Sequence, residues 1–173
     1  MRLTQSRKAA QARAKPHSLA QSRKDAKVHI FLQSRAVSRK DVRDIVMTEN
    51  EIAKQVVDAA YKIHARFGPG LLESAYQAML VHDLRKRGLH VVCEQPIPLI
   101  YDGVELEVGF RADMVVEGRV IVELKSVETT LPVHKKQVIT YLKLADMRLG
   151  LLINFGAAYI KDGIVRLVNG LKE

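Results

Sequence analysis

The sequence contains little that could cross-link the chain, since its 173 residues include one cysteine. Cys93 has no partner for an internal disulfide or a cysteine-rich zinc site, so neither device holds the fold, and the composition suits a reducing compartment. No apolar run approaches the roughly 18 residues that a transmembrane helix needs, and the N-terminus lacks the apolar core of a secretory signal. We therefore expect a soluble, cytoplasmic protein that has no membrane partner.

Acidic residues are scarce in the first part of the chain. Residues 1–47 hold 12 Lys and Arg against 3 Asp and Glu, which accounts for the whole net charge of +9. Residues 48–173 hold the other 28 − 12 = 16 basic and 19 − 3 = 16 acidic residues. The basic character therefore belongs to the N-terminal segment, and the remainder of the chain is formally neutral.

Residues 1–46 are rich in Arg, Lys, Gln, Ser and Ala and repeat Gln, Ser and Arg at 5–7, 21–23 and 33–35. They cannot bury enough apolar surface to offset the entropy of ordering, so we expect disorder. Three interpretations remain open: a basic arm that binds phosphate backbones, an organelle transit peptide, and a translated leader upstream of a true start at Met47. A predicted capping box of Thr48 and Glu51 follows Met47 at once, which favours the leader and a domain over 47–173.

Hydrophobic periodicity in this domain predicts an α/β fold. It indicates a helix from Glu49 to the turn at 68–70 and a second helix that ends at 85–88. The other expected elements are strands near 90–95, 97–101, 104–110, 111–116 and 119–125, a helix over about 133–147, an apolar strand at 149–155 and a short hairpin about 161–163. The order is α-α-β-β-β-β-β-α-β-β, and we expect a mixed sheet flanked by helices.

Charged side chains interrupt two apolar strands. Asp113 precedes Met114, Val115 and Val116, and Glu123 follows a run of branched apolar residues, although buried acids are costly unless they are paired or bind a cation. Glu123 and Lys125 are two apart, so both point to one face of a strand. Converging carboxylates can hold a hard divalent cation, which makes a nucleophile of bound water, while Lys125 stabilises charge on a phosphate. This chemistry is typical of phosphodiester hydrolysis.

The connection between these strands decides whether the two acids meet. A two-residue turn at Glu117-Gly118 would pair Asp113 with Val122 and leave Glu123 on the opposite face. A three-residue connection over 117–119, with glycine in the left-handed conformation, or a bulge would pair Asp113 with Glu123, and we predict one of these. From these residues alone, a surface ladder of cross-strand charge pairs competes with the metal site.

Polar side chains on two flanking helices favour the metal site. Gln137 and Tyr141 share one helix face, as do Glu73 and Tyr76. The segment from Gly70 to Tyr76, Gly-Leu-Leu-Glu-Ser-Ala-Tyr, resembles the signature of the bacterial and archaeal proteins named GxxExxY, which belong to the PD-(D/E)XK nuclease superfamily.

The resemblance extends to the strands and to the later helix. Asp113 resembles the superfamily aspartate, and residues 123–125, Glu-Leu-Lys, resemble its (D/E)XK element. Residues 137–141, from Gln to Tyr, resemble the Gln-x-x-x-Tyr motif of the RecB-like branch. Ala112 stands where the superfamily name has proline, a departure that we treat as minor.

The resemblance implies a restriction-endonuclease-like core and a metal-dependent nuclease. Its Mg²⁺ or Mn²⁺ would be held by Asp113, Glu123, the carbonyl of Leu124 and, directly or through water, Glu73. Lys125, Gln137 and Tyr141 complete the implied catalytic set, with DNA preferred to RNA as the nucleic-acid substrate.

Two other functions remain open: a non-catalytic nucleic-acid-binding or assembly module with this fold, and a structural subunit of a larger complex. A formally neutral domain would need a homodimer, a protein partner or the basic segment for phosphate binding. Three cations outside the motifs are also candidates for phosphate contacts. Arg111 lies two residues before Asp113, where an ion pair with Glu105 or Glu107 competes with a phosphate. Lys135 and Lys136 begin the helix that follows Lys125.

Overall fold

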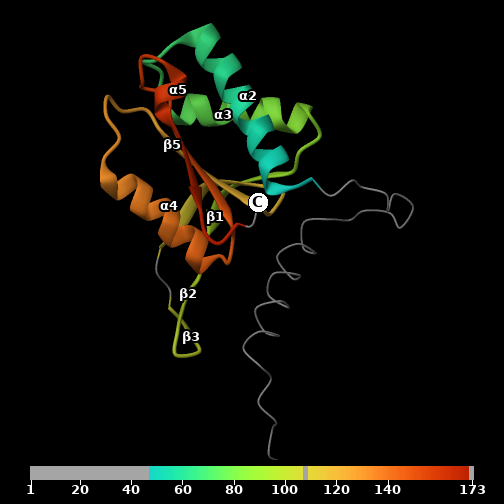
Figure 1. The fold of residues 1–173 in the computed structure, drawn as a ribbon, viewed down its shortest axis with the longest axis vertical. Helices are drawn as coiled ribbons and strands as arrows, with labels where there is room; N and C mark the ends of the chain where they lie inside the picture. The colour runs from blue at the N-terminus through green and yellow to red at the C-terminus, as the bar shows by residue number, and fades with distance from the viewer. Residues whose placement is uncertain (1–46, 107–108, 172–173) are drawn as a thin grey trace, which may run out of the picture. The chain divides into compact units, whose positions relative to one another are not determined.

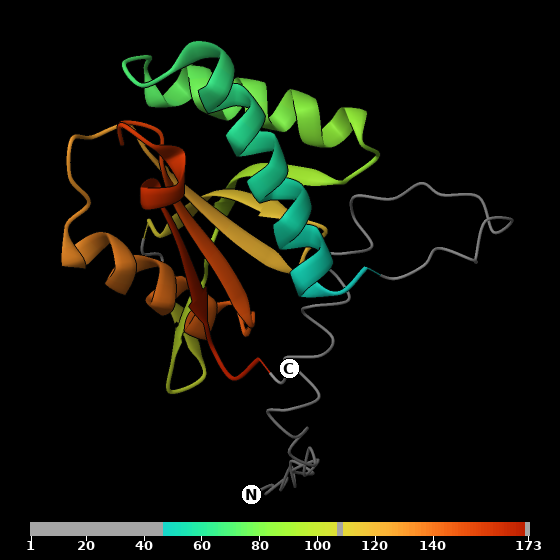
Figure 2. The same ribbon diagram turned by 45° about the horizontal axis from the view of Figure 1, so that its top comes forward.

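The computed structural model describes residues 47–106 and 109–171, which form a five-stranded sheet with helices on both faces (Figures 1 and 2). The predictions made for residues 1–46, disorder and the three interpretations of its role, lie outside these residues. So does part of the strand predicted over 104–110, because residues 107–108 are not described.

The observed elements follow the predicted α/β order with one addition. They are the helices α2 (Glu49–Phe67) and α3 (Glu73–Lys86), the strands β1 (Val91–Pro96), β2 (Leu99–Tyr101), β3 (Val104–Leu106), β4 (Arg111–Val116) and β5 (Val120–Lys125), the helix α4 (Pro132–Leu144), the strand β6 (Leu149–Asn154), the short helix α5 (Ile160–Gly163) and the strand β7 (Ile164–Val168). The predicted start of α2 is confirmed, since the Thr48 hydroxyl accepts from the amide of Glu51 and the Glu51 carboxylate accepts from the amide of Thr48.

The hairpin predicted about residues 161–163 is wrong, because these residues belong to α5. An Asp-Gly pair is a common turn signal, but Gly163 serves close packing instead. A Cβ at this position would lie 2.3 Å from the carbonyl oxygen of Asn154. The helix α5 therefore packs directly on the end of β6 before β7 begins.

The sheet has the order β1-β4-β5-β6-β7, in which β5 and β6 are parallel and the other pairs are antiparallel. The predicted mixed sheet is thus confirmed. The helix α4 connects the parallel pair and covers one face, while α2, α3 and α5 lie on the other (Figures 1 and 2). The strands β2 and β3 form a separate hairpin that projects away from the sheet.

Alternate residues of β5 face the two helical layers, as the two-residue period of a strand requires. Val120, Val122 and Leu124 pack in the core beneath α2 and α3, and Ile121 packs in the core beneath α4. Glu123 and Lys125 share the face of Ile121, so the sheet presents them toward α4. Among the residues that the structure describes, no helix is long and apolar enough to cross a membrane.

The connection between β4 and β5 has three residues, the first of the two alternatives that the sequence predicted. Val116 pairs with Val120 and Met114 pairs with Val122, so residues 117–119 form the turn. Gly118 adopts the left-handed conformation with a φ of 62°, and Glu117 also has a positive φ of 51°. The pairing ends at Met114 and Val122, and beyond it the Asp113 carboxylate accepts from the amide of Leu124, next to Glu123.

Candidate active site

Asp113 and Glu123 lie on neighbouring strands with their carboxylates on the face toward α4. The Oδ2 atom of Asp113 accepts a hydrogen bond of 2.7 Å from the backbone amide of Leu124, which fixes the aspartate across the strand pair. The side chain of Glu123 is 3% exposed and that of Asp113 is 23% exposed. The structure therefore brings the two predicted acids together at the buried end of a shared site.

Lys125 occupies the middle of this group. Its Nζ atom donates to Oε1 of Glu123 at 2.9 Å and also to the carbonyl oxygen of Leu124. The same atom lies 4.0 Å from Oδ2 of Asp113 and 4.0 Å from Oε1 of Glu73, which α3 contributes from its first turn. One ammonium group is thus surrounded by an oxygen from each of the four residues predicted as metal ligands.

Gln137 and Tyr141 join the site from α4. The Nε2 atom of Gln137 donates to Oε1 of Glu123 at 3.0 Å and to the Tyr141 hydroxyl at 2.9 Å. Residues four apart on a helix lie one above the other, so one face of α4 delivers both. All six side chains predicted for the catalytic set therefore belong to one connected group.

The electrostatics of the site reflect burial and crowding of like charges. Burial raises the pKa of Glu123, and the negative charge of Asp113 raises it further. Burial also raises the pKa of Asp113. For Lys125, burial acts to lower the pKa, but the hydrogen bond that it donates to Glu123 and the charges of the surrounding carboxylates outweigh burial and leave the pKa above its ordinary value. The lysine therefore stays protonated beside two acids whose ionised forms are disfavoured by burial.

The donor set fits a divalent cation. The Oε2 atom of Glu123 is buried and has no hydrogen-bond partner among the described residues, a condition that is rare for a carboxylate oxygen. Two carboxylates and a backbone carbonyl are the hard oxygen donors that Mg²⁺ and Mn²⁺ prefer. In residues 47–106 and 109–171, however, no three His, Cys, Asp or Glu side chains lie close enough to hold one ion. Glu73 contacts Lys125 and does not join Asp113 and Glu123.

Tyr76 holds the loop that precedes Glu73. The ring is fully buried and stacks on Phe155 with a centroid separation of 4.3 Å. Its hydroxyl donates to the carbonyl of Gly68 at 2.6 Å and accepts from the amide of Leu71 at 3.2 Å. Gly70, with a φ of 111°, allows the chain to turn between these two contacts. The motif from Gly70 to Tyr76 thus places Glu73 by closing the connection between α2 and α3.

Two polar residues that position the site were not predicted from the sequence. Asn154, which is 3% exposed, accepts from the amides of Val127 and Gly156 and donates to the carbonyl of Val127 at 2.8 Å. Its position at the end of a fully apolar strand was the signal that could have identified it. Gln77, one residue after Tyr76, donates to the backbone carbonyl of Asp113 at 3.0 Å and had no such signal.

The three additional cations do not join the site. Arg111 binds Glu94 at 2.7 Å across β4 and β1, and not the expected Glu105. The alternative partner, Glu107, lies outside the described residues. The register that pairs Gln95 with Ala112 brings Glu94 beside β4. Lys135 and Lys136 are exposed on the first turns of α4.

Comparison with known proteins gives one result that bears on this geometry. The family model described as the PD-(D/E)XK nuclease superfamily matches residues 50–167, a span that covers all or nearly all of each element from α2 to β7. Searches of curated proteins and of solved structures give no match.

Proposed function

Because the chain belongs to the PD-(D/E)XK nuclease superfamily, we propose that residues 47–173 form a metal-dependent nuclease that hydrolyses nucleic-acid phosphodiester bonds. The observation that supports this most directly is the position of the Lys125 ammonium among oxygens of Asp113, Glu123, Leu124 and Glu73. The same hard oxygens can hold a divalent cation once it takes the place of the ammonium group.

Each residue has a role that follows from its contacts. Asp113 and Glu123, with the carbonyl of Leu124, would hold Mg²⁺ or Mn²⁺, which when bound polarises the phosphate and makes water a better nucleophile. The Leu124 amide keeps the Asp113 carboxylate in place, and Gln137 orients Glu123 through its hydrogen bond to Oε1. Lys125, released from the carboxylates, would neutralise charge that develops on the phosphate.

We further propose the finer assignment within the superfamily. The segment from Gly70 to Tyr76, together with the contact between Gln137 and Tyr141, supports the GxxExxY group and the RecB-like branch. Glu73 would act through water, since it stands 4.0 Å from Lys125 on the open side of the site. DNA is the preferred substrate over RNA in this assignment.

Cleavage can be tested with the full chain on labelled single- and double-stranded DNA and RNA in Mg²⁺ or Mn²⁺. We expect Lys125→Ala to lower the rate at least about a hundredfold, as removal of one electrostatic stabiliser commonly does. Lys143→Ala, an exposed lysine in the last turn of α4, is the matched control and should cleave like the wild type. Equal cleavage by Lys125→Ala would refute the assigned role. Binding without cleavage by the wild type would favour the non-catalytic module.

The metal site can be tested separately by calorimetric titration of Mn²⁺. The wild type should bind, and Asp113→Asn should bind at least about tenfold more weakly, because it loses a charged ligand but keeps an oxygen for the Leu124 amide. Asp146→Asn is the control for loss of an exposed acid. Equal affinity of wild type and Asp113→Asn would argue against the proposed ligand set.

A further inference from the structure

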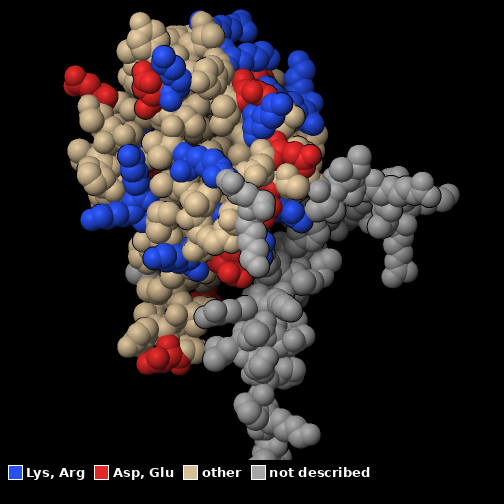
Figure 3. All heavy atoms as spheres, in the orientation of Figure 1, with Lys and Arg blue, Asp and Glu red and all other residues tan. Residues whose placement is uncertain are grey.

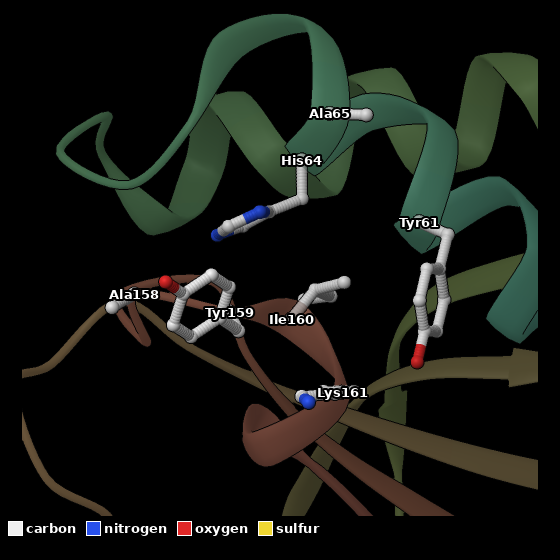
Figure 4. A pocket seen from close by; sticks show the side chains of 7 residues that line it. All are labelled: Tyr61, His64, Ala65, Ala158, Tyr159, Ile160 and Lys161. Atoms are coloured by element: carbon white, nitrogen blue, oxygen red, sulfur yellow. The ribbon is translucent and has the colours of Figure 1, made fainter.

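A shallow hollow of about 200 Å³ lies between the carboxyl-terminal half of α2 and the segment that leads into α5. Its lining residues are Tyr61, His64, Ala65, Ala158, Tyr159, Ile160 and Lys161. In Figure 4 the rings of Tyr61 and Tyr159 stand on either side of Ile160. Both rings are exposed, Tyr61 to 44% and Tyr159 to 69%. The exposed tyrosine rings and the apolar side chain of Ile160 suit the stacking of a flat aromatic ring.

Cations accompany the exposed rings at this end of the molecule. The Nζ atom of Lys161 lies 5.8 Å from the centroid of the Tyr159 ring. The guanidinium of Arg66 lies 5.2 Å from the ring of Phe67, which is itself 45% exposed. Aromatic rings that receive bases, with cations close by for the phosphates, are the features by which proteins bind single-stranded nucleic acid.

The charge of the domain is poorly suited to duplex binding. A duplex hides its base faces in the stack and presents phosphates, so affinity for it depends on many cations. Residues 48–173 have equal numbers of basic and acidic side chains, 16 of each. Figure 3 shows the two kinds interspersed over one face of the described residues. Contacts to exposed bases would therefore have to supply the binding free energy that the balanced charge of the domain does not.

The hollow and the acids are joined by a hydrogen-bonded loop network at one end of the sheet. The Nε2 atom of His64, in the wall of the hollow, lies 2.9 Å from the carbonyl oxygen of Ala157. Three residues earlier, Asn154 binds both backbone groups of Val127, which follows Lys125 by two residues. The loops between expose further apolar side chains, namely Leu72, Val127 and Leu131. A strand bound in the hollow would reach the acids across the carboxyl ends of β5 and β6.

We propose that the hollow between Tyr61 and Tyr159 binds an unpaired nucleobase, which makes single-stranded nucleic acid the substrate class of the site; this rests on the proposed nuclease function. The base stacks on the exposed ring of Tyr159 beside Ile160, Lys161 faces a neighbouring phosphate, and the continuing strand passes the exposed loops toward Asp113 and Glu123. DNA and RNA share this chemistry, so the oligonucleotides of the test distinguish them.

The test is fluorescence anisotropy of labelled single-stranded DNA, single-stranded RNA and duplex DNA of equal length. The full chain carrying Lys125→Ala is the background, so that little substrate is consumed. We expect tighter binding of a single strand than of the duplex. Tyr159→Ala should weaken single-strand binding about tenfold, within the range for loss of one stacked base, and Tyr159→Phe should restore it. Tyr101→Ala is the matched control, since Tyr101 is 67% exposed on the separate β2–β3 hairpin.

The outcomes separate this proposal from the nuclease function. Equal binding of duplex and single strand, or an equal effect of Tyr159→Ala and Tyr101→Ala, would overturn the base site even if the wild type cleaves. Single-strand binding that depends on Tyr159 would support the base site even if no substrate is cleaved. A change of oligomeric state in gel filtration on Tyr159→Ala, with unchanged binding, would assign the hollow to a second copy of the chain and overturn the proposal.

Discussion

The carboxylate of Glu123 combines two conditions that folding normally avoids, since it is buried and it faces a second acid. Its Oε2 atom has no hydrogen-bond partner within the described part of the chain, and Lys125 and Gln137 both bind Oε1. A buried carboxylate that destabilises the fold is typical of functional sites, where a charged group is kept in place for binding or catalysis although it lowers stability.

Glu123→Gln should therefore stabilise the metal-free protein by about 0.5–2 kcal/mol, in the range of other relieved functional sites. A carboxyl whose pKa is raised by folding contributes most stability below its ordinary pKa and loses that contribution as pH rises through the raised value. The stability gap between variant and wild type should thus open with rising pH. Thermal melts of both proteins in chelator across a pH series measure it.

Glu128→Gln is the control for this prediction, because Glu128 is exposed in the loop after β5 and its substitution should change stability by less than about 0.5 kcal/mol. A Glu123→Gln variant that melts below the wild type at every pH would show that the carboxylate stabilises the fold. In that case the charge of Glu123 would be satisfied by Lys125 alone.

At the scale of elements, helices, strands and turns could be predicted where hydrophobic periodicity or a single geometric condition determined them. The three-residue turn over 117–119 could be predicted, with a bulge as the alternative, because a two-residue turn would leave Asp113 and Glu123 on opposite faces. The helix α5 could not, because the Asp-Gly pair at 162–163 carries a strong local turn signal, and only tertiary packing against Asn154 overrides it. The contacts of Gln77 and Asn154 likewise depend on which distant backbone groups each side chain meets.

The packing of α4 on β6 depends on a glycine and gives the next prediction. A Cβ at Gly150 would lie 2.6 Å from Cγ1 of Val138 and 3.3 Å from Cδ1 of Leu142. Valine is stiff about χ1, so it cannot turn away easily and α4 must shift. Gly150→Ala should cost about 1–3 kcal/mol of stability, as overpacking of a core does. Denaturant unfolding measures this, and Mn²⁺ titration should show weaker binding because Gln137 moves with Val138.

Gly109→Ala is the control, since nothing lies within 4 Å of a Cβ there. The double variant Gly150→Ala with Val138→Ala provides the decisive comparison. If the clash causes the loss, removing the Val138 methyls should recover part of it, and the two changes should be non-additive. Additive losses would show that Gly150 has a role other than the close approach of α4.

At the scale of the whole molecule, charge and site chemistry lie in different parts of the chain. The site is built from α3, β4, β5 and α4, in a domain with balanced charge, whereas the excess of nine positive charges belongs to residues 1–47. The sequence alone was sufficient to locate this asymmetry, because it depends on counting residues and not on how they pack. Affinity that depends on charge and affinity that depends on stacking should therefore be separable by mutation.

If the first 46 residues act as a basic arm, replacing the twelve Lys and Arg of residues 1–47 by Gln should reduce the salt dependence of single-strand binding. Each cation that engages a phosphate contributes about 0.7 to the slope of log K against log salt concentration. Tyr159→Ala, in contrast, should lower affinity at every salt concentration and leave the slope nearly unchanged, because stacking releases no counterions. Anisotropy titrations of the full chain over a range of NaCl concentrations measure both effects. An unchanged slope in the Gln-substituted chain would exclude the basic arm, and the interpretations of a transit peptide or an upstream leader would remain.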